Sequence, residues 1–520
     1  MPAPISHSSA LAAPGPAHRA AWVGPALLAA TVAVSRVPFL TPGYGTDTDA
    51  WKLAHAARFI GTEGRYLVSR LPGYPIQELV SALVWKGGPL ALNALSALFS
   101  VVATVLLFLA ARRLGLRQAG LIGLAFAFTP AVYIGSVSAM DYLWAAAFLM
   151  GALVLALDGR AAVAGIALGL ATGCRITSAM FLLPLALVFA SRTPAPRLRR
   201  IVVLAATAAF IGAVCYLPAY LTYGIRFLSY YDPQGPRRSV VEFLAGMFHP
   251  QPGVFAPIFV AGQATVGVFG ILGAAAVGVC VLGALISVVR RKRDLPARDV
   301  AVEPRLLWGL TLGVVLPLLL YLRLPADEGY LIPAVPFLLL VLAARSSYRL
   351  FLATCLLLIA SPFVLGVDAV PPKKAVSPTR CSALAREFRL GREIMVLDPL
   401  RGQLLMDDAK RRRTMALVPV ALEQLERQQP GDLLLAGQLE YVLFYIAPDD
   451  RNHPRYRDCL SRAELDTCFA RGARVVYLPD VRRRTLRLEH YDLRETRAVP
   501  ADPNQDGPRG GASPAAGTPR

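Results

Sequence analysis

The sequence predicts a polytopic α-helical membrane protein with about eleven transmembrane helices, followed by a small α/β domain near the C-terminus. Of its 520 residues, 55% are hydrophobic and only 17% are charged, which is more apolar surface than a soluble domain of this length can bury. The apolar runs are about 20 residues long, enough to cross roughly 30 Å of hydrocarbon as helices. They also lack the alternating pattern of a membrane barrel.

The spans are assigned from the length and hydrophobicity of each apolar run. They are residues 20–40, 89–111, 118–136, 141–157, 161–174, 176–190, 201–221, 262–289, 305–322, 331–344 and 350–367. The fifth and sixth are short for a full crossing. Together the spans define a transmembrane domain at residues 19–367, and a Pro- and Ala-rich tail at residues 1–18 precedes it that we expect to be disordered.

Residues 368–498 form the predicted second domain. Short β-like runs occur at residues 394–397, 414–418, 432–435 and 474–478, with a helical stretch at 421–428 between the second and third. A disulfide between Cys459 and Cys468 would suit an oxidising compartment, and it leaves Cys381 over. The Gly- and Pro-rich tail at 499–520 is expected to be disordered.

Basic clusters in short, alternate loops predict the orientation of the chain in the membrane. The clusters are Arg112, Arg113 and Arg117, then Arg192, Arg197, Arg199 and Arg200, then Arg290, Arg291, Lys292 and Arg293. Because such clusters stay on the cytoplasmic side, the N-terminus is predicted to be cytoplasmic and the C-terminal domain extracytoplasmic, in a cell (inner or plasma) membrane. The net charge of +20 is then mostly a topology signal, and nucleic acid is not an expected partner.

The first outer loop, residues 41–88, contains a predicted amphipathic helix. Between residues 50 and 60, Lys52 and Arg58 fall on one side of a helical wheel, while Trp51 and Leu53 lie away from them. This pattern predicts a helix that lies in the membrane interface, in contact with lipids.

Two carboxylates, Asp47 and Asp49, open this helix. Thr46 and Asp49 have the spacing of a capping box, and the macrodipole favours an acid at a helix N-terminus, so one reading is structural. In the functional reading, a carboxylate at the membrane surface takes a proton from a hydroxyl while the helix N-terminus holds an anion.

Other charged residues stand at the boundaries of spans. Asp141 begins the fourth span, either as a helix cap or as a further site carboxylate. Arg175 lies between the fifth and sixth spans, where its charge is costly unless it snorkels or meets a partner such as a lipid phosphate. Arg323 and Tyr330 lie just before the tenth span, where the residues alone indicate an ordinary polar loop with an aromatic interface anchor.

The first outer loop resembles that of a known family. The run Asp49-Ala-Trp-Lys-Leu-Ala-His-Ala-Ala-Arg58, continuing to Gly64-Arg-Tyr66, is similar to polyprenyl-phosphate-sugar-dependent glycosyltransferases of the GT-C type. That group includes the protein mannosyltransferases and the lipid A aminoarabinose transferases. In its pattern an Asp is followed by a helix with Ala-Arg and then by Gly-x-Tyr, and Asp49 falls on that Asp.

The chain also departs from the family pattern. The family usually has Asp-Glu, whereas this chain has Ala50 in the second place and Asp47 two residues before the first. The segments Ser69–Pro75 and Asn93–Ala97 are also similar to members of the family. The resemblance as a whole covers roughly residues 20–345.

The resemblance implies transfer of a sugar from a polyprenyl-phosphate donor to a glycan, lipid or protein acceptor. Asp49 would be the base that deprotonates the acceptor hydroxyl, with Asp47 or Asp141 orienting the acceptor or tuning its pKa. The leaving lipid phosphate needs fixed positive charge, for which the candidates are, in order, Arg175, Arg70 and Arg323. The residues implied in substrate binding are Trp51, Tyr74 and Tyr330.

Two other classes of protein remain as alternatives. A transporter or flippase of a lipid-linked precursor would more often place its acids in mid-membrane than at a boundary. A non-catalytic scaffold would only display the C-terminal domain. The sequence has no metal-binding motif, and Asp47-x-Asp49 is too common a pattern to imply a divalent cation, which stays an open cofactor.

Overall fold

The computed structural model describes residues 16–192, 197–228, 256–291, 303–323, 327–370, 382–390, 393–447, 455–457, 460–478 and 494–495. The chain divides into two compact units. The first contains residues 1–370 and 378–412, and the second contains residues 371–377 and 413–520. The first break lies close to the predicted boundary at residue 368, but the chain then returns to the first unit.

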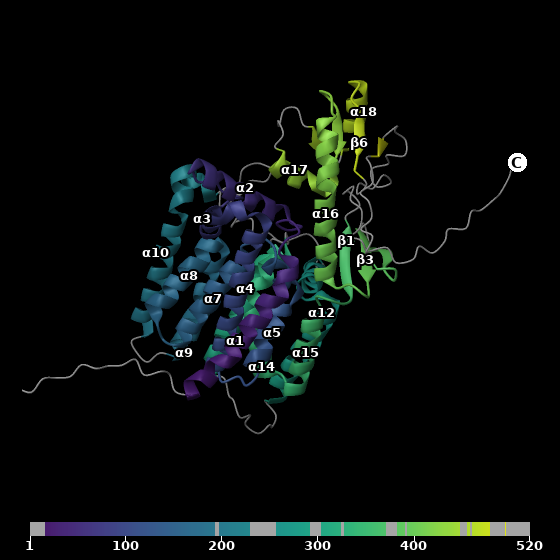
Figure 1. Ribbon diagram of the computed structural model, residues 1–520. Helices are drawn as coiled ribbons and strands as arrows, with labels where there is room; N and C mark the ends of the chain where they lie inside the picture. The colour runs from purple at the N-terminus through teal and green to yellow at the C-terminus, as the bar shows by residue number, and fades with distance from the viewer. Residues whose placement is uncertain are drawn as a thin grey trace, which may run out of the picture. The chain divides into compact units, whose positions relative to one another are not determined.

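The first unit is built from apolar helices, several of them long, that pack beside one another (Figure 1). They are α1 (Pro16–Arg36), α4 (Gly88–Arg113), α5 (Ala119–Phe128), α6 (Pro130–Ser136), α7 (Tyr142–Leu157), α8 (Ala161–Cys174), α9 (Leu182–Arg192), α10 (Arg197–Tyr223), α12 (Ala256–Arg291), α13 (Pro304–Arg323), α14 (Val335–Arg345) and α15 (Tyr348–Ala360). Short 3-10 helices η3 (Ile176–Phe181), η4 (Gly224–Leu228) and η5 (Glu328–Ala334) flank α9, α10 and α14.

Each predicted span falls on one or two of these helices. Among the described residues, five helical segments are long and apolar enough to cross a membrane, or six if α5 and α6, which are bent by 69°, form one span. The other apolar helices have 10 to 17 residues. The chain is therefore a mostly helical protein compatible with several membrane crossings, and the count of eleven stays a prediction.

Two helices lie across one end of the long helices in Figure 1, namely α2 (Thr48–Glu63) and α3 (Pro75–Val84). The amphipathic helix predicted at residues 50–60 is confirmed as part of α2, with Trp51 and Leu53 buried and Lys52 and Arg58 exposed. The helix ends at Gly64, whose φ of 63° is the left-handed conformation that suits glycine.

Helices α8 and α10 pack closely against each other. Gly165, Gly169 and Gly173 recur every four residues and so share one face of α8. A Cβ atom on Gly169 would lie 2.6 Å from the Cβ of Ile211 and 2.9 Å from the carbonyl oxygen of Ala208, closer than real side chains approach. The glycines therefore let the two backbones meet, as small residues do in membrane helix pairs.

The polar C-terminal region contains two sheets. The first is antiparallel, with strands β1 (Gly366–Val370), β3 (Glu393–Asp398) and β2 (Arg386–Leu390) in that order. The second is parallel, in the order β5 (Tyr456–Arg457), β4 (Leu433–Leu435), β6 (Val475–Tyr477) and β7 (Arg494–Glu495). The second unit also contains α17 (Glu440–Ile446) and α18 (Arg462–Ala470). The strands predicted at 394–397, 432–435 and 474–478 are thereby confirmed.

The strand predicted at residues 414–418 is wrong, because these residues lie inside α16 (Gln403–Glu426). The run Thr414-Met-Ala-Leu-Val418 was read alone, yet helix-forming residues continue on both sides of it and carry one helix through. The helical stretch predicted at 421–428 is the end of that helix. Cys468 on α18 is a free thiol. Its predicted disulfide partner, Cys459, lies outside the described residues.

Candidate functional site

The turn that begins α2 is fixed by its neighbours. Asn93 on α4 donates to the carbonyl oxygens of Leu40 and Gly43 at 2.8 and 2.9 Å. The indole N–H of Trp51 donates to the carbonyl oxygen of Gly45 at 3.0 Å. Trp51 is only 4% exposed, so this residue, predicted to bind substrate, instead holds the turn in place.

The helix cap differs from the predicted capping box. Asp47 is the N-cap of α2, and its carboxylate accepts from the backbone N–H of Asp49 at 2.8 Å. Thr46, predicted as the capping residue, instead donates its hydroxyl proton to the carboxylate of Asp407 on α16 at 2.6 Å. The Asp49 side chain is left to face the site rather than its own helix.

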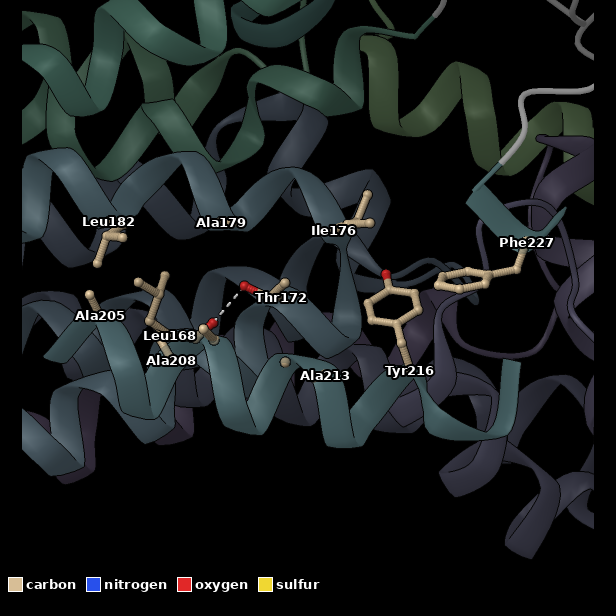
Figure 2. A pocket seen from close by; sticks show the side chains of 12 residues that line it. Leu168, Thr172, Ile176, Ala179, Leu182, Ala205, Ala208, Ala213, Tyr216 and Phe227 are labelled. Atoms are coloured by element: carbon tan, nitrogen blue, oxygen red, sulfur yellow. Dashed lines mark hydrogen bonds between the residues drawn. The ribbon is translucent and has the colours of Figure 1, made fainter. Parts of the chain in front are cut away.

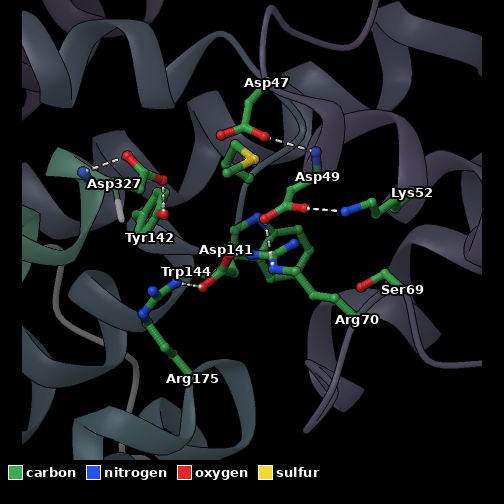
Figure 3. A network of polar contacts seen from close by, with 12 residues as sticks. Asp47, Asp49, Lys52, Ser69, Arg70, Asp141, Tyr142, Trp144, Arg175 and Asp327 are labelled. Atoms are coloured by element: carbon green, nitrogen blue, oxygen red, sulfur yellow. Dashed lines mark hydrogen bonds and ion pairs between the residues drawn. The ribbon is translucent and has the colours of Figure 1, made fainter. Parts of the chain in front are cut away.

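A chain of ion pairs connects four predicted site residues (Figure 3). Arg70 contacts Asp49 at 3.0 Å through Nε and Asp141 at 2.6 Å through Nη2. The second oxygen of Asp141 contacts Nη1 of Arg175 at 2.5 Å. Lys52 completes the chain with a contact of 3.0 Å to the other oxygen of Asp49. Asp141 precedes α7 without capping it, and its fully buried carboxylate serves the two arginines instead.

Tyrosine rings surround the two guanidinium groups. The Arg70 guanidinium carbon lies 3.9 Å from the ring centre of Tyr74, and that of Arg175 lies 4.4 and 4.3 Å from the ring centres of Tyr142 and Tyr330. These are cation–π distances, so the rings stabilise both charges. The predicted residues Tyr74 and Tyr330 therefore belong to the site, and Tyr142 joins them.

Asp327 closes the site from the side of η5. One of its oxygens accepts from the backbone N–H of Gly329 at 2.8 Å, and the other accepts from the hydroxyl of Tyr142. Asp327 lies just before the tenth predicted span, and no local pattern indicates that its side chain reaches Tyr142 at the start of the fourth. The side chain of Arg323, the third arginine predicted to bind phosphate, lies outside the described residues.

Glu78, which sequence reasoning missed, fastens the loop that carries Arg70. Its carboxylate is fully buried and accepts from the Tyr66 hydroxyl at 2.5 Å and from both the backbone N–H and the hydroxyl of Ser69 at 2.7 Å. Tyr216 on α10 donates to the carbonyl oxygen of Gly73 at 3.2 Å and holds the other end of the loop. The sequence feature that could have identified Glu78 is its position as the single acid in the apolar helix α3.

The two carboxylates at the start of α2 have opposite electrostatic surroundings. Burial raises the pKa of Asp47 to about 6, and the negative charges of Asp49 and Asp327 act in the same direction. Burial also raises the pKa of Asp49, but the positive charges of Arg70 and Lys52 outweigh it, so that this pKa falls below its ordinary value. The pair thus combines a carboxylate that titrates near neutrality with one that stays ionised.

An apolar cavity of about 330 Å³ opens between α8, α9 and α10 (Figure 2). Small residues of α10 form one wall, and Tyr216 and Phe227 stack at one end with their ring centres 5.7 Å apart. Ile176, which also lines the cavity, directly follows Arg175. The full lining is Leu168, Thr172, Ile176, Ala179, Leu182, Ala205, Ala208, Ala209, Gly212, Ala213, Tyr216 and Phe227.

Within the described ranges, no group of three or more His, Cys, Asp or Glu side chains is arranged to hold a metal ion. The acids of the cluster have arginine, lysine, tyrosine or backbone partners instead. The arginine and lysine side chains supply positive charge, which favours the binding of an anion.

No family model matches the chain, and comparison with curated proteins and with solved structures gives no match either.

Proposed function

We propose that this chain is a membrane glycosyltransferase, which transfers a sugar from a polyprenyl-phosphate donor to an acceptor hydroxyl at the outer face of a cell membrane. The observation that carries the proposal is the pair of arginines, Arg70 and Arg175, held together by the buried carboxylate of Asp141. These groups lie beside the carboxylate pair Asp47 and Asp49 at the N-terminus of α2. The site thus combines fixed positive charge with a proton acceptor.

The arginines suit the leaving group of this reaction. As the glycosidic bond to the phosphate breaks, negative charge grows on the phosphate oxygens, and preorganised cations stabilise that charge most in a site with little water. Arg175 is 4% exposed and Arg70 16% exposed, so both charges are largely shielded from solvent. Guanidinium groups also match the geometry of phosphate oxygens better than lysine does.

The cavity beside α10 suits the lipid part of the donor. Its lining is almost entirely apolar, and one lining residue, Ile176, directly follows Arg175 in the chain. A polyprenyl chain in this cavity would leave its phosphate near the guanidinium group. Burial of each methylene or methyl group of such a chain is worth about 0.8 kcal/mol, which favours a lipid-linked donor over a free sugar phosphate.

The proposal includes the topology that the basic loops predict. About eleven helices would cross the membrane, the N-terminus would be cytoplasmic, and residues 368–498 would form an extracytoplasmic α/β domain. The similarity of the first outer loop to GT-C glycosyltransferases agrees with this arrangement. Helices α2 and α3 would then lie at the outer surface with the charged cluster beneath them.

The experiment is a transfer assay with purified protein in lipid vesicles. The donors are a panel of polyprenyl-phosphate sugars, and the measured product is free polyprenyl phosphate. We expect the wild type to release it and Arg175→Gln to release it at least about a hundredfold more slowly. Arg58→Gln, which changes an exposed arginine on the outer face of α2, is the matched control and should behave as the wild type.

Two outcomes would overturn the proposed function. One is a wild-type protein that leaves every donor of the panel intact. The other is movement of the intact donor between the two leaflets without loss of its sugar, which would identify a transporter or flippase.

A further inference from the structure

We infer that Asp47, and not Asp49, takes the proton of the acceptor hydroxyl. The inference rests on the proposed function and deepens it, because the resemblance in sequence assigns this role to Asp49. It is carried by the partners of each carboxylate in the site.

Asp49 is already paired with two cations. One oxygen lies 3.0 Å from Nζ of Lys52 and the other lies 3.0 Å from Nε of Arg70. A carboxylate held in this way is a weak base, because protonation would break both ion pairs. The contacts of Asp49 favour a different role, in which it holds Arg70 in place for the donor phosphate.

Asp141 is excluded from proton transfer for a similar reason. Its two oxygens contact Arg70 and Arg175 at 2.6 and 2.5 Å, and the side chain has no exposed surface. A substrate hydroxyl has no access to either oxygen unless the arginines leave.

Asp47 differs from both. Among the residues that the structure describes, its side chain has no ion-pair partner, and one oxygen accepts only from the backbone N–H of Asp49. The other oxygen makes no hydrogen bond within that part of the chain, and the side chain is only partly buried. It is therefore the carboxylate of the pair that a substrate hydroxyl can approach.

The charges around Asp47 strengthen it as a base. Asp49 on α2 and Asp327 before η5 both face it with negative charge, and Arg70 from the loop before α3 faces it with positive charge. A third acid, Asp407 on α16, accepts a hydrogen bond from Thr46, the residue that precedes Asp47. With a pKa of about 6, Asp47 is mostly ionised at neutral pH yet binds a proton more readily than Asp49.

The reaction then balances as follows in atoms and charge. The acceptor oxygen forms a bond to the anomeric carbon while its proton passes to the carboxylate of Asp47. The bond between the anomeric carbon and the phosphate oxygen breaks, and the electron pair leaves with the polyprenyl phosphate. Asp47 afterwards gives its proton to water.

The test compares Asp47→Asn with Asp49→Asn in two measurements, transfer from the active polyprenyl-phosphate sugar across pH, and binding of sugar-free polyprenyl phosphate. We expect Asp47→Asn to lower kcat at least about a hundredfold and to change the Kd for polyprenyl phosphate less than about threefold. Its residual rate should lose the acid limb near pH 6 that the wild type shows. Asp49→Asn should keep the limb but shift it below pH 6, because Asp47 loses the negative charge of Asp49 beside it. It should also weaken binding of polyprenyl phosphate, because Arg70 loses one of the partners that hold it in place.

A rescue experiment separates a base from a structural residue. Formate should restore part of the turnover of Asp47→Ala and none of that of Asp49→Ala, because only the first lacks a proton acceptor. Near-normal kcat in Asp47→Asn, or an acid limb that persists in it, would overturn the assignment while the wild type still transfers sugar. A wild type that transfers no sugar would instead overturn the proposed function itself.

Discussion

The hydroxyl of Thr46 donates to the carboxylate of Asp407 at 2.6 Å, although 361 residues separate them in the chain. Asp407 also contacts Arg411 at 2.9 Å, and this buried arginine donates to the carbonyl oxygen of Val137 at 3.0 Å. The first turns of α16 thus hold the residue that precedes Asp47. The same helix continues into the second unit of the chain.

This contact predicts an energetic coupling between Thr46 and Asp407. Thr46→Val and Asp407→Asn should each lower the rate of sugar transfer several-fold, because each frees the turn that carries Asp47. Together they should cost less than the sum of the single changes, with a coupling of about 0.5–1.5 kcal/mol. A double-mutant cycle on transfer rate measures this, and strictly additive effects would show that the hydrogen bond does not position the site.

Glu78 is predicted to matter for both stability and donor binding. Glu78→Gln keeps the shape of the side chain but weakens its bonds to Tyr66 and Ser69, and a buried polar group with lost partners costs about 1–3 kcal/mol. We expect a lower Tm in detergent and a higher Kd for polyprenyl phosphate, because Arg70 lies on the loop that Glu78 fastens. Glu63→Gln, an exposed change at the end of α2, is the control, and an equal effect there would contradict the prediction.

Asp47 is predicted to lower the stability of the protein above pH 6. Its pKa of about 6 exceeds the value of 3.8 for an unperturbed Asp, so ionisation costs more in the folded state than in the unfolded state. This cost is absent below pH 3.8, grows as pH rises to about 6 and is constant above it. Allowing for partial exposure, Asp47→Asn should raise the free energy of unfolding by about 1–2 kcal/mol at pH 7–8.

The helix cap should survive that change, because Asn caps as well as Asp. Thermal unfolding of wild type and Asp47→Asn across pH checks the prediction. A difference that is constant from pH 4 to pH 8, or an Asn variant that is less stable at pH 8, would rule it out.

The α8–α10 contact predicts a large effect from one methyl group. Gly169→Ala places a Cβ atom 2.6 Å from that of Ile211, so the helices must separate, and overpacking of this kind costs about 1–3 kcal/mol. The matched control is Gly120→Ala on α5, where nothing lies within 4 Å of the new atom. Thermal unfolding in detergent should show a lower Tm for the first variant alone, and similar curves for both would refute the close packing.

The predicted orientation can be tested by cysteine labelling. A cysteine placed at Thr62 should react with a membrane-impermeant reagent in intact cells, whereas one placed at Arg112 should react only after lysis. Cys468, in the C-terminal region, should also be reached from outside. The reverse pattern would move the whole site to the cytoplasmic face.

Local patterns in the sequence predicted the elements of the fold far better than the contacts between them. The apolar spans were found because each helix carries its own hydrophobic signal. Residues 414–418 were misread because a five-residue window cannot reveal a helix that extends well beyond it.

Most residues of the site were predicted from the sequence, but the contacts between them were not. Asp49, Asp141, Arg70 and Arg175 were all predicted site residues, but no local pattern indicated that Arg70 would pair with both Asp49 and Asp141. Such ion pairs depend on tertiary packing of distant helices, which no local pattern records. Trp51 was predicted to bind substrate because the sequence does not show that its indole N–H donates to the carbonyl oxygen of Gly45.

The bridge that Asp141 forms between Arg70 and Arg175 makes the carboxylate an internal counter-ion. An incoming anion must compete with it for the same N–H groups, so capture is an exchange of partners rather than a simple addition of charges. Such competition lowers the affinity of the site for phosphate, both for the phosphate that binds and for the phosphate that must be released. A site arranged in this way binds an anion less tightly and releases it faster.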